Sequence, residues 1–230
     1  MSTRKSNSKY NLIVTAHADD ETIFFGGLIL SRRTLPWKIV CVTDGNADGQ
    51  GLKRKKQFEK ACALLNVKNL EWLSFPDIFE KRLDTEKLIE YLSVLPKPNE
   101  IFTHGILGEY GHPHHQDVCY SVHQSFKKHP KLYSTAWNCY PDLSVKISKA
   151  QYQKKCYILS EIYGSETRRF FNLLPATALE GFARVDASEV EAIYEFYTQG
   201  QLLKRSQLKH YHWLWQRLQE QGPNLGQRLF

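Results

Sequence analysis

The chain has 230 residues and a net charge of +7 at pH 7, with 42% hydrophobic and 24% charged residues, which is typical of a folded globular protein. This length predicts one domain over residues 1–230, and the composition argues against fibrous and wholly disordered classes. No segment approaches the ~20 apolar residues of a membrane-spanning helix, and the scattered cysteines argue against a disulfide framework, so we expect a cytoplasmic protein.

Short β-rich segments alternate with longer helical patterns along the first 139 residues. The expected strands are residues 10–16, 37–43, 70–75, 100–103 and 132–139, and the expected helices are residues 21–32, 52–65, 84–95 and 114–128. This alternation predicts an α/β fold with a Rossmann-like, mostly parallel sheet and helices on both faces. Ligands of such sheets bind beyond the carboxyl ends of the strands, so we expect the active site there.

The alternation is lost after residue 140. Residues 144–163 predict a helix, residues 168–182 are irregular, and residues 187–217 are helical and rich in aromatic side chains. We interpret the segment from about residue 165 to residue 230 as a helical cover on the sheet. Its aromatic run, residues 211–215, is expected in the core or at a contact between copies of the chain in a homo-oligomer.

The first expected strand runs directly into His17, Asp19, Asp20 and Glu21. These groups would be costly at the edge of a core unless something pairs with them. A second polar cluster, residues 109–117, follows the fourth strand and contains three histidines. Histidine and aspartate are ordinary zinc ligands, and three protein ligands with an open position make a catalytic site. His17, Asp20 and one histidine of the second cluster therefore predict a metal site.

The two clusters resemble motifs of the LmbE/PIG-L family of metal-dependent N-deacetylases. HADDE, at residues 17–21, is similar to AHPDDE of that family, and HPHH, at residues 112–115, is similar to HPDH. The similarity keeps the same order over about residues 10–165. It implies that His17, Asp20 and His115 hold Zn²⁺ or another divalent metal such as Fe²⁺.

The resemblance also implies roles for five other residues. Asp19 would be the general base, His112 would face the developing oxyanion, and Tyr110 would lie beside the substrate carbonyl. Lys56, which stands where the family has an arginine, and Asp77, after the third strand, would contact the substrate. Amide hydrolysis needs a proton acceptor and an oxyanion donor, which agrees with the first two roles.

The chain departs from the family pattern at two positions. Ala18 replaces a proline, which removes no functional group, and His114 replaces the aspartate of HPDH. Without that aspartate His112 should be less basic unless Asp117 substitutes for it, and His114 becomes an alternative third ligand. Glu21 is expected either to support His17 from behind or to act as a charge in the first turn of a helix.

Other polar residues receive no role in the metal site. His104 is expected to be structural or to line the pocket wall, and His123 and His129 are expected on the surface of a helix. Arg54 is, beside Lys56, a candidate contact for a substrate phosphate.

These residues and the resemblance predict a hydrolase that removes the N-acetyl group from an N-acetylated amino sugar and releases acetate. The sugar could belong to a GlcNAc-type glycoside, a sugar nucleotide, a glycolipid or an antibiotic precursor. The positive charge favours a phosphate-bearing substrate, and basic and aromatic residues interleave too weakly to predict a nucleic-acid partner. Two alternatives stay open, an amidase for a larger N-acyl group and a sugar- or nucleotide-sugar-binding module with weakened catalysis.

Overall fold

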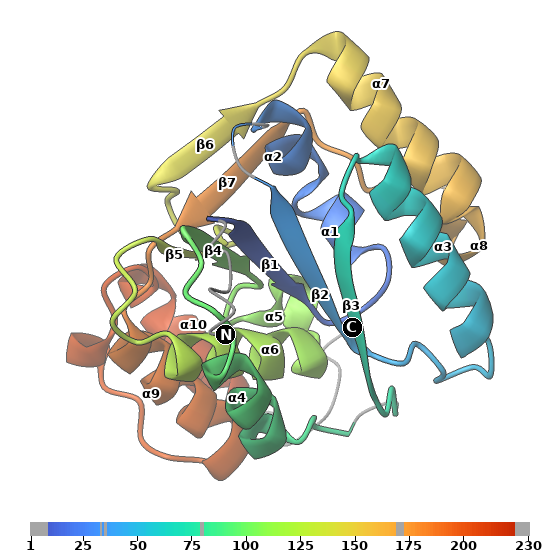
Figure 1. The fold of residues 1–230 in the computed structure, drawn as a ribbon. Coiled ribbons are helices and arrows are strands. Elements are labelled where there is room, and N and C mark those ends of the chain that lie inside the picture. Colours follow the sequence, from blue (N-terminus) through green and yellow to red (C-terminus); the bar gives the residue numbers. More distant parts are fainter. Residues whose placement is uncertain (1–8, 33, 35, 79–80, 169–172, 224–230) are drawn as a thin grey trace, which may run out of the picture.

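The computed structural model describes residues 9–223 except residues 33, 35, 79–80 and 169–172, and a single sheet lies at its centre (Figure 1). The order of its strands is β3-β2-β1-β4-β5-β7-β6. The first five in this order are parallel, and β7 and β6 are antiparallel at one edge. The strands are β1 (Asn11–Thr15), β2 (Trp37–Thr43), β3 (Asn69–Phe75), β4 (Glu100–Thr103), β5 (Leu132–Thr135), β6 (Leu143–Lys146) and β7 (Leu179–Ala183).

Helices cover both faces of the sheet. The helices are α1 (Asp20–Ile23), α2 (Gly26–Ser31), α3 (Gly51–Leu64), α4 (Thr85–Ser93), α5 (Gly108–Gly111), α6 (Pro113–Ser125), α7 (Lys149–Tyr157), α8 (Gly164–Thr167), α9 (Ala187–Gln199) and α10 (Trp215–Gln221), with shorter turns η1 (Ile158–Ile162), η3 (Arg205–Gln207) and η4 (His212–Leu214). One face packs against α2, α3 and η1, and the other packs against α4 and α6, with α9 behind α6 (Figure 1). Within the described residues, no helix is long and apolar enough to cross a membrane.

The central strands bury side chains on both faces. In β1, Leu12 and Val14 belong to the core beneath α4 and α6, whereas Ile13 belongs to the core beneath α2 and α3. This alternation follows from the two-residue period of a strand, and it explains why β1 is an unbroken apolar run in the sequence. Each such buried side chain contributes ~1.5–3 kcal/mol. The predicted fold class is confirmed, and the parallel strands all direct their carboxyl ends to one edge.

The last third of the chain differs from the sequence prediction. β6 lies where a helix was expected and β7 lies in the expected irregular segment, and both extend the sheet. Strands this short show too few residues to reveal a period. The helix predicted from residue 144 begins only at α7, after β6, where Ser148 and Gln151 form a capping box. β5 also ends four residues earlier than predicted. The expected cover is therefore partly sheet, and its residues 169–172 and 224–230 lie outside the described residues.

A buried ion pair breaks the helix that the sequence predicts over residues 21–32 into α1 and α2. Glu180 of β7 lies 2.6 Å from Lys155 Nζ of α7 and accepts hydrogen bonds from the backbone N–H groups of Gly27 and Leu28. A Cβ on Gly27 would lie 2.8 Å from the Glu180 carboxylate, so a larger residue here would displace Glu180 from its hydrogen bonds. The pair fixes where α2 begins and thereby separates α1, which starts at Asp20, as a short independent turn.

His123 is fully buried, so its predicted place on a helix surface is wrong. Its Nε2 lies 2.9 Å from the Ser134 hydroxyl oxygen of β5. The reason is that α6 packs between the sheet and α9, which leaves it no broad solvent face. His129, beyond the end of α6, is half-buried. Burial lowers the pKa of His123 to about 3.

The depressed pKa of His123 should make folding stability sensitive to acid. An unfolded histidine binds a proton near pH 6.5, whereas the folded chain does so only near a pKa of about 3, so the unfolded state binds more protons in between. Stability should therefore fall as the pH drops from about 6.5, by up to about 1.4 kcal/mol per pH unit. His123→Gln should reduce this slope in urea unfolding, and His212→Gln, which removes an exposed histidine, should not. Equal slopes in both variants would contradict the assignment.

Candidate metal centre

Polar side chains from several chain segments meet at the carboxyl edge of the parallel strands. His17 follows β1, Asp77 follows β3 and His104 follows β4. The histidines of residues 112–115 come from the turn between α5 and α6 and from the start of α6. The sequence prediction that these segments lie together at one edge of the sheet agrees with their positions.

His17, Asp20 and His115 form a compact donor set. Asp20 Oδ2 lies 3.4 Å from His17 Nδ1 and 3.5 Å from His115 Nε2. Ligand atoms about 2.0–2.2 Å from a tetrahedral zinc ion lie about 3.3–3.6 Å from one another, so both distances fit one ion. All three side chains are buried, and one donor atom of each lies within 4.8 Å of the others.

The ring of His115 is oriented by Glu109. His115 Nδ1–H donates to Glu109 Oε2 at 2.6 Å, so the lone pair of the ring is on Nε2. This Nε2 is buried and has no hydrogen-bond partner within the described residues. A buried acceptor without a partner costs about 1–3 kcal/mol, and a cation beside Asp20 would remove that cost. The donor set therefore fits a metal ion.

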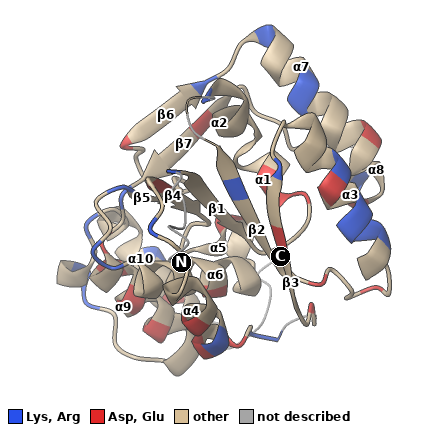
Figure 2. Ribbon diagram, viewed as in Figure 1, with Lys and Arg blue, Asp and Glu red and all other residues tan. Residues whose placement is uncertain are grey.

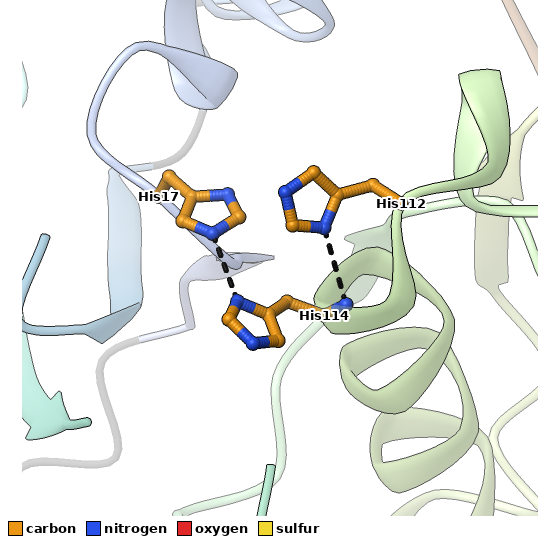
Figure 3. Close-up of side chains that lie close together, drawn as sticks. All are labelled: His17, His112 and His114. Carbon is orange, nitrogen blue, oxygen red and sulfur yellow. Dashed lines mark hydrogen bonds between the residues drawn. The ribbon is translucent and has the colours of Figure 1, made fainter. Parts of the chain in front are cut away.

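His114 orients the ring of His17 in the same way. The carbonyl oxygen of Lys81 can only accept, so His114 Nε2–H donates to it at 2.7 Å and His114 Nδ1 carries the lone pair. His17 Nε2–H then donates to this Nδ1 at 3.1 Å (Figure 3), which leaves the lone pair of His17 on Nδ1, facing Asp20. Metal-bound histidines usually donate their second N–H to such an acceptor.

Ionisation states in the donor set suit metal binding. Burial lowers the pKa of His17 and of His115, which favours the neutral rings that a metal requires. Burial opposes ionisation of Asp20, but His115 and His104 hold the pKa of this carboxyl well below its ordinary value. Asp20 Oδ2 also accepts the backbone N–H of His17 at 2.7 Å. The set thus offers two neutral nitrogens and one carboxylate.

Glu109 and His104 form a layer behind the donor set that the sequence reasoning left without a role. The His104 ring is stacked on His115 with centroids 3.8 Å apart, and its Nδ1 lies 3.3 Å from Glu109 Oε2. The backbone N–H of Ala16 donates to His104 Nε2 at 3.0 Å. His104 Nε2 also lies 3.2 Å from Asp20 Oδ2, and its complete burial agrees with the structural role that was one of the two predicted for it. In the sequence, only its position inside the second polar cluster, residues 109–117, pointed to a role for Glu109.

Asp19 lies in a strained turn between two members of the donor set. Its φ of 102° is in the left-handed region that non-glycine residues rarely adopt, at a cost of about 1–3 kcal/mol. The Asp19 N–H donates to Glu21 Oε2 at 3.0 Å, and the Tyr163 hydroxyl donates to Glu21 Oε1 at 2.9 Å. Burial raises the pKa of Glu21 to about 7. Glu21 lies in the first turn of α1, as one of the two predictions for it states, and its buried carboxyl holds the turn of Asp19.

His112 and Tyr110 lie on the outer side of the donor set. The N–H of His114 donates to His112 Nδ1 at 3.2 Å, so in the neutral ring the proton is on Nε2 (Figure 3). The centroid of His112 is 4.6 Å from that of His17 and 4.7 Å from that of His115. The Tyr110 ring is 5.4 Å from His115. The structure thus places both residues beside the donor set.

His114 and Asp77 also lie against His17, and the centroid of the His114 ring is 5.2 Å from that of His112. Asp77 Oδ1 is 3.6 Å from His114 Nδ1 and 3.8 Å from His17 Nε2. His17, His112 and His114 form a second set of donor atoms within 4.8 Å, so geometry alone permits either His114 or His115 beside His17. Of the two sets that contain His17, only the one with His115 includes a carboxylate, and a third set joins His115 to His104 and Glu109.

Asp117 has a different task from the one considered for it. Its carboxylate accepts hydrogen bonds from the Arg82 guanidinium at 2.9 Å, from the N–H of Leu83 at 2.8 Å and from the Tyr194 hydroxyl at 2.8 Å. These contacts tie the segment after β3 to α6 and α9, and that segment carries the Lys81 carbonyl that orients His114. Asp117 therefore supports the site indirectly, because it holds in place the segment whose Lys81 carbonyl orients His114.

The predicted phosphate contacts lie away from the histidine cluster. Lys56 lines a groove of about 410 Å³ between α3 and η1, beside Lys53 and Lys60, and no described residue of the cluster lines that groove. Arg54 is buried and pairs with Glu166 at 2.7 Å. Figure 2 shows that lysine and arginine gather along α3 and α7. The lysines of this groove therefore lie on α3, and other basic residues are spread over the loops around β5 and α9.

Known proteins share both the motifs and the fold. Residues 12–126, half of the chain, match the family described as PIG-L: GlcNAc-PI de-N-acetylase. The bovine N-acetylglucosaminyl-phosphatidylinositol de-N-acetylase is 36% identical over 88 residues, which are 35% of this chain and 35% of the bovine one. The matched segment spans about a third of the length of the curated relatives.

Solved structures resemble the chain in fold. The N,N'-diacetylchitobiose deacetylase of Pyrococcus horikoshii has a TM-score of 0.55 at 19% identity, over 78% of this chain and 85% of the other. The 4-carboxy-2-hydroxymuconate hydratase of Pseudomonas putida has a TM-score of 0.56 at 15% identity, over 76% and 95%. At such identities the likeness shows the fold alone, and the two names differ in activity, so function has to be argued from the site.

The fold and the cluster define an α/β protein with a candidate metal centre beyond its strand ends. The chain belongs to the PIG-L family, because half of its length matches that family and both polar clusters lie within or beside the match. The resemblance predicted from the HADDE and HPHH motifs is thereby confirmed.

The orientation of the rings predicts which histidine the metal needs. His115→Ala should lower bound divalent metal from about one ion per chain to near zero after dialysis, because two remaining ligands bind zinc poorly. His114→Ala should retain most of the metal, since it removes only the acceptor behind His17. His212→Ala removes an exposed histidine and is the matched control. Elemental analysis that finds metal lost only in His114→Ala would make His114 the third ligand.

Proposed function

We propose that the chain is a metal-dependent N-deacetylase that removes the acetyl group from an N-acetylated amino sugar. The observation that carries this proposal is the arrangement around Asp20. The unpartnered Nε2 of His115 and Nδ1 of His17 both face its carboxylate, and Asp19 is held beside it in a strained turn. Strain of this kind collects at functional sites. A binding module would not need a general base beside the donor set.

The proposed metal ligands are His17, Asp20 and His115. A Zn²⁺ ion held there would supply Lewis acidity and lower the pKa of a coordinated water toward ~7. Asp19 is adjacent to Asp20 in the chain and is buried with the donor set, so we assign it to accept the proton of the attacking water. The N–H of Asp19 is bound by Glu21, which fixes the backbone from which this carboxylate extends.

His112 is the proposed oxyanion donor. Its Nδ1 accepts the His114 N–H, so its Nε2 carries the proton that a developing oxyanion would receive as a hydrogen bond. The backbone N–H of His114 orients the ring by donating to Nδ1, whereas an aspartate would accept a hydrogen bond from it. The proton that Asp19 takes from the attacking water would go to the departing amine, and Tyr110, 6.0 Å from His112, would lie beside the substrate carbonyl.

The proposed substrate carries an N-acetylglucosamine unit. The bovine relative is named for N-acetylglucosaminyl-phosphatidylinositol and the archaeal structure for N,N'-diacetylchitobiose, and an N-acetylated glucosamine unit is common to both names. Lys53, Lys56 and Lys60 along one groove support a phosphate-bearing carrier for this sugar. The five cysteines form no disulfide, which supports a reducing compartment such as the cytoplasm.

Acetate release from a panel of N-acetylglucosamine conjugates, with and without added Zn²⁺ or Fe²⁺, tests the proposal. We expect metal-dependent release of one acetate and one free amine per turnover. N-butyryl analogues separate the deacetylase from an amidase for larger acyl groups. Binding of the conjugates without any metal-dependent release would indicate a binding module instead.

Replacement of Asp19 separates the general base from the metal ligands. Asp19→Asn should keep its metal but lower turnover by ~10²–10⁴-fold, which is the usual contribution of a positioned general base. Asp84→Asn is the matched control, because Asp84 caps α4 outside the site and asparagine also caps helices well. Steady-state rates and metal content are measured on the same samples. Near-normal turnover in metal-loaded Asp19→Asn would remove Asp19 from the mechanism.

A further inference from the structure

Aromatic side chains extend outward from the ligand His115. Phe24 is buried and meets His115 edge-on, with centroids 5.9 Å apart, and Trp137 meets Phe24 edge-on at 6.0 Å. Tyr110 also meets His115 edge-on, with centroids 5.4 Å apart. We call Phe24, Tyr110 and Trp137 the aromatic wall. Two successive ring contacts place Trp137 within about 12 Å of His115.

Trp137 is the exposed end of this wall. Its side chain is 47% exposed, although an indole is among the most favourable groups to bury. It follows β5, a parallel strand whose carboxyl end lies at the same edge of the sheet as His17 and His104. Asn138, the next residue, adopts a left-handed conformation that asparagine tolerates, so the turn is defined by its sequence.

We propose that Trp137 is the sugar-stacking residue of the site and binds the apolar face of the substrate pyranose. This inference rests on the proposed function. One face of a pyranose ring presents C–H groups, and the electron-rich face of an indole ring is the natural partner for them. The acetamide carbon is two bonds, about 2.5 Å, from the ring carbon that bears the nitrogen. A carbonyl at the donor set therefore places the sugar ring beside the aromatic wall.

The wall would give the site selectivity for a cyclic amino sugar over a simple amide. The acetyl group is recognised at the donor set, where His112 and Tyr110 lie, and contacts there are the same for any N-acetyl amine. A stacking contact on the ring adds binding that a ring-free amide lacks. Trp137 is a specificity residue in this proposal and takes no part in proton transfer.

Substitution of Trp137 in the metal-loaded full chain tests the proposal. Trp137→Ala should raise the KM for methyl N-acetylglucosaminide by about tenfold and change kcat by less than about twofold, because it removes uniform binding. The same variant should leave kcat/KM for ring-free N-acetylethanolamine unchanged. Trp137→Phe should restore most of the loss. Trp213→Ala is the matched control, because Trp213 is 57% exposed but lies in η4 at the far end of the chain.

Ligand binding provides a readout that does not depend on turnover. Methyl N-acetylglucosaminide should quench tryptophan fluorescence in the wild-type chain and in Trp213→Ala, and the quenching should be lost in Trp137→Ala. Quenching that depends on Trp137 without any acetate release would contradict the proposed function and support the stacking site. Acetate release with a KM unaffected by Trp137→Ala, or an equal loss on the ring-free amide, would overturn the stacking site alone.

Discussion

One buried carboxylate organises the candidate site. Asp20 Oδ2 is the point toward which His17 and His115 both direct a nitrogen, at 3.4 and 3.5 Å, and it also accepts the backbone N–H of His17. His104 Nε2 lies 3.2 Å from the same oxygen, and a cation held here would give the nitrogens of His17 and His115 and the carboxylate a common partner. His17 follows the end of β1, Asp20 begins the short helix α1, and His115 lies in the first turn of α6.

The surrounding structure prepares the two rings for that cation. Glu109 takes the outer N–H of His115, and His114, itself fixed by the carbonyl of Lys81, takes the outer N–H of His17. Both tautomers are therefore set before any ligand arrives, which is the role that groups behind metal ligands usually have. Asp19 and Glu109 have positive φ angles, so the fold holds strain at two acidic residues of one site.

The sequence predicts those parts of the site in which residues that can bind metal follow the ends of parallel strands. Parallel strands end at one edge, so the motifs around His17 and His115 could be brought together from their positions alone. The orienting role of Glu109 could not be predicted, because it depends on a strained, non-helical backbone conformation inside α5 that no local pattern encodes. The strands β6 and β7 were missed because they are short, and His123 was misplaced because the packing of α9 on α6 is a tertiary feature.

The central claim concerns where the metal is held, and anomalous diffraction at the zinc absorption edge from crystals grown with Zn²⁺ tests it most directly. The account predicts one strong peak about 2.0–2.2 Å from His17 Nδ1, a carboxylate oxygen of Asp20 and His115 Nε2. A peak held instead by His17, His112 and His114 would contradict it.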